Sequence, residues 1–166
     1  TQTYRYQRGY YDRQERKFRG FARVETTDTE LRTEQGDMAD ALFKRQQSAQ
    51  TPFAPIVTRT WYHQGTLQCG TDRRDYCQDD PQAMILAATL YVSRAGQALQ
   101  PEQRVVMARA LAGSVLRAEV WGMPPAEQIC SAVLYSVSES RYRVELLSFH
   151  DPKAAVVMPQ LLETLQ

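Results

Sequence analysis

Two aromatic segments of alternating character meet at a short polar turn near the start of the chain, and no other feature constrains the fold as strongly. The turn lies between Tyr11 and Lys17. On the second arm one parity is apolar or small and the other is mostly charged: Phe18, Gly20, Ala22 and Val24 against Lys17, Arg19, Arg23 and Glu25. This period of two predicts a β-hairpin over residues 3–11 and 17–26 with one covered face. Phe21 interrupts the pattern, so we expect Gly20 to let a ring or another backbone come close.

Further strands are expected where β-branched and aromatic residues lie between turn signals. Residues 56–63 follow Pro52 and Pro55, and Gly65 ends the segment. The same signature recurs over residues 114–121, 130–138, 141–148 and 154–158, with a turn at Gly122, Met123, Pro124 and Pro125. The sequence therefore predicts an α+β fold of mainly antiparallel β-hairpins with one or two short helices.

The best helix signal begins at Pro101, with Glu102 in the first turn and Gly113 as the stop. Its expected apolar stripe is Val106, Met107, Ala110 and Leu111. A second, short buried helix is predicted over residues 84–92, because Asp80 and Pro81 form a sound helix start. Residues 28–50 are polar, with one helical piece at Met38, Ala41, Leu42 and Arg45, and residues 70–80 have the composition of a surface loop.

Length and charge bound the class of protein. The 166 residues suit one domain, the formal net charge is +1, and no run of about 18 apolar residues offers a membrane helix. We expect no direct membrane contact. The sequence starts at Thr1 without a signal-peptide pattern, so we expect residues 1–166 to be a single fragment of a larger polypeptide.

The three cysteines leave the redox state open. Cys69, Cys77 and Cys130 form an odd set in which only one bridge, between Cys69 and Cys77, is suggested. A metal site built from them with His63 does not fit, since paired zinc ligands normally lie two to four residues apart. Free, buried or half-buried thiols are the better interpretation.

Catalytic motifs are missing from the sequence. The two histidines, His63 and His150, lie far apart in the chain, and neither a nucleophile elbow, a phosphate loop nor a zinc-protease motif is present. We expect no enzyme, no catalytic residue, no metal site and no cofactor. Carboxylate pairs such as Glu139 with Glu145 are interpreted as parts of solvated strand faces.

The opening hairpin also supports a second hypothesis, a binding module for nucleic acid or protein. Basic residues alternate there with rings: Arg5, Arg8, Arg13, Arg16, Lys17, Arg19 and Arg23 with Tyr4, Tyr6, Tyr10, Tyr11, Phe18 and Phe21. Such a surface can stack bases and bind phosphates. We favour cross-strand pairing instead, because nucleic-acid domains usually carry a stronger basic excess than this chain.

Several motifs in order resemble one known family. They are Gly9-Tyr10-Tyr11-Asp12 with Phe18-Arg19-Gly20-Phe21; Thr60-Trp61-Tyr62-His63 with Gly65; Leu116-Arg117 with Glu119-Val120; and Tyr135-Ser136-Val137-Ser138-Glu139 with Tyr142, Val144 and Leu147. Together they resemble a segment, outside the propeller, of the B component of the bacterial Tc insecticidal toxins, within the wider SpvB-like and Rhs/YD-repeat group.

The resemblance implies a mechanical role. In that family the B component joins a C component and winds Rhs-type β-layers into a hollow shell, which encloses a cytotoxic effector and docks on the pore-forming A component. The implied partners of this chain are other regions of its own B polypeptide, the C component and, through the complex, the A component. The implied location is secreted, as part of a bacterial toxin complex, and the implied fold is a segment of that shell.

Overall fold

The computed structural model describes residues 2–28, 55–67, 85–123 and 132–166. These residues form a seven-stranded sheet and, within the described ranges, a single short helix. The elements are β1 (Gln2–Asp12), β2 (Lys17–Asp28), β3 (Ile56–Tyr62), β4 (Leu90–Ser93), α1 (Pro101–Arg109), β5 (Val115–Gly122), β6 (Val133–Phe149) and β7 (Ala155–Leu165). No helix among them is long and apolar enough to cross a membrane.

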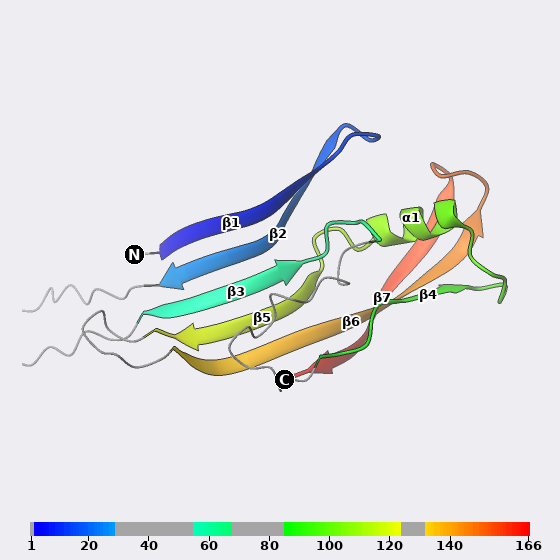
Figure 1. Cartoon of the computed structure of the whole chain (residues 1–166). Helices are drawn as coiled ribbons and strands as arrows, with labels where there is room; N and C mark the ends of the chain where they lie inside the picture. Colours follow the sequence, from blue (N-terminus) through cyan, green and yellow to red (C-terminus); the bar gives the residue numbers. More distant parts are fainter. Residues whose placement is uncertain (1, 29–54, 68–84, 124–131) are drawn as a thin grey trace, which may run out of the picture.

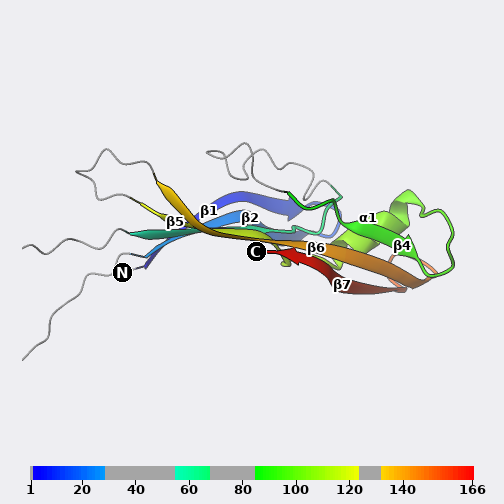
Figure 2. The same cartoon turned by 90° about the horizontal axis from the view of Figure 1, so that it is seen from below.

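The described residues form a long, twisted sheet that is one layer thick over most of its length, with α1 at one end (Figures 1 and 2). Its strands follow the order β1-β2-β3-β5-β6-β4, and β7 also pairs with β6. Glu139 of β6 pairs with Arg117 of β5 and with Leu165 of β7, so these two strands lie on opposite sides of β6. Strands β1 and β7 are therefore the two long edges of the described sheet.

The opening hairpin is confirmed, with an irregularity at its twisted end. Phe21 lies opposite Gly9 and Phe18 lies opposite Tyr11, so Arg19 and Gly20 together face one residue of β1. Gly20 has a φ of 92° and nothing within 4 Å of an added Cβ, so the bulge requires its backbone conformation and not its small size. The close approach expected there occurs at Gly9, where an added Cβ would lie 3.2 Å from the Phe21 ring. The bulge explains why Phe21 breaks the parity.

One expectation for β2 is wrong: it has no covered apolar face. Residues 19–28 are half-buried on both parities, and Phe18 is exposed. The described residues provide no second layer over the hairpin, and so the alternation does not produce a buried side there.

Helix α1 forms where the sequence predicts it. The side chain of Gln103 accepts a hydrogen bond from the Gln100 amide at 2.9 Å, which caps the first turn. Met107 and Leu111 are buried as expected, whereas Ala110 is exposed and Ala108 is buried in its place. The helix packs on β6 and β7, where Val144 and Leu146 complete the larger apolar core.

Two further expectations are corrected by the sheet. The described part of the predicted helix 84–92 contains no helical residue, and it ends in β4, which runs parallel to β6. Tyr91 packs there against the core under α1. Pairing with β6 and this packing therefore outweigh the local preference for a helix. The segments predicted at 130–138 and 141–148 are one strand from Val133 to Phe149, β6, because Ser138 to Arg141 contain no Gly, Pro, Asn or Asp that would turn the chain.

Other expectations for the remaining segments are confirmed or lie beyond the described ranges. Strands β3, β5 and β7 match the segments predicted at 56–63, 114–121 and 154–158, although β7 extends to Leu165. The helical piece at 38–45, the loop at 70–80, the helix start at Asp80 and the three cysteines lie outside the described residues.

Candidate functional site

One face of the sheet carries a row of ion pairs and tryptophans across four strands, which we call the charged ladder. Its members are Arg23 and Glu25 of β2, Arg59 and Trp61 of β3, Arg117, Glu119 and Trp121 of β5, and Glu139 of β6. The register places them side by side: Arg23, Trp61, Arg117 and Glu139 are successive cross-strand partners, and so are Glu25, Arg59 and Glu119. Directly paired residues share a face, so the ladder is one continuous surface.

The buried end of the ladder centres on Arg117. Its Nε donates to Glu119 Oε1 and its Nη1 to Glu139 Oε2, each at 2.8 Å. The second oxygen of Glu119 accepts from Trp121 Nε1 at 3.0 Å. Arg117 is 0% exposed and the two carboxylates are at most 3% exposed. A buried cation held by two carboxylates fixes the register of β5 against β6, since a slip of one residue would leave these charges unpaired.

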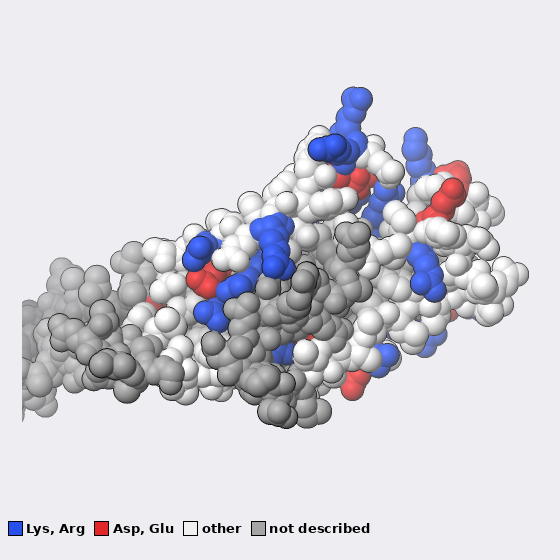
Figure 3. Space-filling view, viewed as in Figure 1, with Lys and Arg blue, Asp and Glu red and all other residues white. Residues whose placement is uncertain are grey.

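The outer end of the ladder is half-buried. Glu25 Oε2 accepts from Arg23 at 3.1 Å and from Arg59 at 3.2 Å. The two guanidinium groups also lie over indole rings, Arg23 at 5.3 Å from the Trp61 centroid and Arg59 at 5.0 Å from that of Trp121. Such cation–π contacts add to the ion pairs. Side chains of both signs lie close together over the strands in the view of Figure 3.

The opposite face of the same strands is uncharged over its central rows. Tyr4, Thr26, Thr58, Val120 and Ser136 are successive cross-strand partners in one such row. The neighbouring row is Tyr6, Val24, Thr60, Ala118 and Ser138. None of these residues is buried. The two faces of the sheet therefore differ in chemistry, with ion pairs on one and hydroxyl and aromatic groups on the other.

Four of the six rings of the basic aromatic hairpin form one row. Tyr4 stacks on Tyr6 with ring centroids 6.4 Å apart, Tyr6 packs on Phe21 at 4.9 Å, and Phe21 packs on Phe18 at 5.2 Å. Of the seven basic residues, Arg19 and Arg23 are held by Asp12 and Glu25 at 3.1 Å. Arg8, Tyr10, Tyr11 and Arg13 instead line a cleft at the twisted end of the hairpin, together with residues of β3 and α1.

The histidines are not brought together as a site. His63 follows β3 and is 1% exposed, and its Nδ1 accepts from the Gly65 amide at 3.0 Å. Burial lowers the pKa of His63 to about 4. Its backbone bonds to Gly113 and Ser114 at 2.8 Å, which ties β3 to the turn after α1. His150 directly follows the C-terminal end of β6 and is exposed. No group of three metal-ligating side chains occurs in the described part of the chain.

Sequence reasoning missed the buried half of the ladder. Glu139 was assigned to a solvated face, but it is 3% exposed and bound to Arg117. A signal was present in β5, where Arg117 and Glu119 share a parity with Trp121. Charged residues aligned with a tryptophan indicate a paired, covered face rather than a wet one.

Comparison with known proteins identifies the relatives of this chain. Residues 1–51 match the family described as the insecticide toxin TcdB middle/N-terminal region, and residues 106–166 match its middle/C-terminal region. The chain belongs to the Tc toxin B-component family. The predicted resemblance is confirmed.

Solved structures of this family share the fold over nearly the whole chain. The crystal structure of TcdB2-TccC3 without its hypervariable C-terminal region is 28% identical over 98% of this chain, with a TM-score of 0.73. A Tc holotoxin pore of Photorhabdus luminescens is 27% identical over 98% of the chain, with a TM-score of 0.71. This chain spans only 7% of each of those chains. The search of curated proteins finds no match.

These relatives are a TcdB2-TccC3 complex and a Tc holotoxin pore.

Proposed function

We propose that this segment is part of the wall of a hollow, Rhs-type β-shell in a secreted Tc toxin, and that the shell encloses a cytotoxic effector. The supporting observation is the form of the sheet, which is a single layer with two long edges (Figure 2). A self-contained domain would bury its sheet against a second layer. Among the described residues, α1 is the one helix that packs on the sheet, and it does so at one end.

Both edge strands carry large apolar side chains that the described residues leave uncovered. In β1, Tyr4 and Tyr6 are each 55% exposed, and in β7, Val156 and Leu161 are 52% and 59% exposed. Long edges of this kind invite pairing with another strand. In the proposed shell, neighbouring regions of the same B polypeptide pair with these edges.

The charged ladder contributes the rigidity that a thin wall needs. It connects four adjacent strands through side chains as well as through the backbone. If Arg117 moved away, the buried carboxylates of Glu119 and Glu139 would lose their counter-charge. The proposed partners are the C component, as in TcdB2-TccC3, and through the complex the A-component pore, as in the Tc holotoxin pore.

A chimera tests this function. The segment replaces its counterpart in the TcdB2 part of a TcdB2-TccC3 complex that carries an effector, and protease resistance of the effector is measured. A wall segment should restore a closed shell, so the effector stays resistant. The wall role would be contradicted if the chimera assembles but its effector is digested as fast as the free effector. A chimera with Arg141→Met, at an exposed ion pair, is the matched control for one with Arg117→Met, which should leak.

A further inference from the structure

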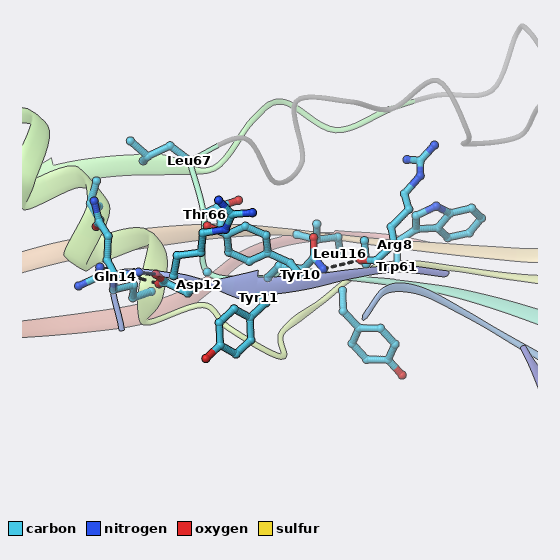
Figure 4. A pocket seen from close by; sticks show the side chains of 16 residues that line it. Arg8, Tyr10, Tyr11, Asp12, Gln14, Trp61, Thr66, Leu67 and Leu116 are labelled. Carbon is cyan, nitrogen blue, oxygen red and sulfur yellow. Dashed lines mark hydrogen bonds and ion pairs between the residues drawn. The ribbon is translucent and has the colours of Figure 1, made fainter. Parts of the chain in front are cut away.

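A cleft of about 640 Å³ opens where four strands and the helix meet, a volume typical of ligand sites. Most of its walls come from the end of β1 and the following turn, from the end of β3 and the following loop, and from α1, while β2 contributes Ala22 and β5 contributes Leu116. Figure 4 shows Arg8, Tyr10 and Trp61 on one side of the β1 ribbon and Tyr11 on the other. The cleft therefore continues the ladder face beyond Trp61.

The backbone around the cleft is fixed by unusual turns. Arg8 takes a left-handed φ of 55°, and Gln64 donates from its side-chain amide to Arg8 O at 2.7 Å and to Gly20 O at 3.1 Å. One glutamine thus bridges β1 and the bulge of β2. A non-glycine residue held in this conformation is uncommon outside functional or tightly constrained sites.

The charges of the cleft favour an anion. Its lining holds three arginines, Arg8, Arg13 and Arg109, and a single carboxylate, Asp12. Asp12 is already saturated, since it accepts from the amides of Gln14 and Glu15 and from Arg19 at 3.0–3.2 Å. Arg109 is held by Glu15 at 3.0 Å. Arg13 is exposed, and within the described ranges no carboxylate lies within ion-pair distance of it.

The remaining walls are apolar or aromatic. Tyr10, Trp61, Leu116 and Val105 face the same cleft. Tyr10 and Val105 are 38% and 37% exposed, so an apolar side chain that contacts them in the cleft would remove apolar surface from water. Gln14 adds an amide group that can both donate to and accept from a peptide bond.

We propose that this cleft binds an extended peptide segment in which a carboxylate side chain lies next to an aromatic or aliphatic one. The carboxylate pairs with Arg13, and the apolar side chain packs between Tyr10, Trp61 and Leu116. This binding site goes beyond the wall role and does not depend on it.

A nucleic acid fits the cleft less well. Its backbone presents a series of phosphates and requires several available cations. Arg19, Arg23 and Arg109 are engaged by carboxylates of this chain. The ring of Phe21 packs with those of Tyr6 and Phe18, and neither phenylalanine lines the cleft. Arg8 and Arg13 are the two exposed arginines of the lining, and Arg13 beside the apolar wall matches a single carboxylate with an apolar neighbour.

The test uses the full 166-residue chain and a fluorescein-labelled peptide, Gly-Glu-Phe-Glu-Gly, with fluorescence anisotropy as the readout. We expect saturable binding that weakens on the order of tenfold with Arg13→Gln, since a charge-assisted pair is lost. Tyr10→Ala should weaken binding by a similar factor. Peptides with Gln in place of Glu, or Ala in place of Phe, should also bind about tenfold more weakly.

Arg16→Gln is the matched control, because Arg16 belongs to the same turn but does not line the cleft. It should leave binding unchanged, and thermal melting should show all three variants folded. Absence of saturable binding to the wild-type chain would overturn the proposal. So would equal losses for Arg13→Gln and Arg16→Gln, or displacement of the peptide by a short oligodeoxythymidylate at lower concentration than by the unlabelled peptide.

Discussion

Replacing Arg117 by Met should destabilise the sheet far more than replacing any exposed arginine. Arg117 is 0% exposed and donates at 2.8 Å to both Glu119 and Glu139. Without the guanidinium, two buried carboxylates lose their counter-charge, and breaking a buried pair in this way costs about 3–5 kcal/mol. For a chain of this size each kcal/mol lowers the melting temperature by about 2–4 °C, so we expect a fall of roughly 6–20 °C.

The measurement is urea unfolding at neutral pH, followed by tryptophan fluorescence, with thermal melting as a second readout. Arg141→Met is the control, since Arg141 is partly exposed and its partner Glu163 is half-exposed at 3.3 Å. Surface pairs of that kind contribute about 0–1 kcal/mol. Adding Glu119→Gln and Glu139→Gln to Arg117→Met should recover part of the loss, because the uncompensated charges are then removed.

The reasoning fails if Arg117→Met and Arg141→Met lower the free energy of unfolding by the same amount. It also fails if the two glutamine substitutions leave Arg117→Met unimproved, because buried charge would then not be the cause of the loss.

Three more outcomes are expected. Burial lowers the pKa of His63 from an ordinary 6.5 to about 4, so between these pH values the unfolded chain binds more protons than the folded chain. The free energy of unfolding should therefore fall by about 3 kcal/mol as the pH drops from 6.5 to 4. In urea titrations at stepped pH, His63→Gln should flatten this part of the stability curve. Gly65→Ala should lower the melting temperature more than Gly96→Ala, although both glycines have positive φ. An added Cβ at Gly65 would lie 3.2 Å from Ala112 and 3.3 Å from Arg109, whereas one at Gly96 would meet open space. Equal losses of melting temperature would show that the contact at Gly65 is harmless. The isolated chain should self-associate through its β7 edge, and Leu161→Lys should shift it toward monomer in analytical ultracentrifugation, whereas a wild-type chain that stays monomeric would count against an open edge.

Elements whose signals are local could be predicted from sequence. The first hairpin follows from its alternation and its turn, where the Asp12 carboxylate accepts from the amides of Gln14 and Glu15. Helix α1 follows from Pro101 and the apolar positions Met107 and Leu111, which need no knowledge of the sheet to be recognised.

Elements that depend on tertiary contacts could not be predicted from the sequence. Strand β4 forms because it pairs with the part of β6 that extends past β5, and this pairing can be foreseen only when the whole strand order is known. The buried parity of β5 is the charged one because Arg117 meets Glu139 across the sheet, 22 residues away in the chain. The cleft is lined by residues of β1, β2, β3, α1 and β5, so no single stretch of sequence predicts it.

Hydrogen exchange along β1 and β7 tests the wall role most directly. The amides of these two edge strands are compared between the isolated chain and a complete B–C toxin complex that contains the segment. If neighbouring strands complete the sheet, the outward amides of Gln2–Asp12 and Ala155–Leu165 exchange fast in the isolated chain and become protected in the complex. Equally fast exchange of these amides in both samples would contradict the proposal that this sheet is one stretch of a continuous wall.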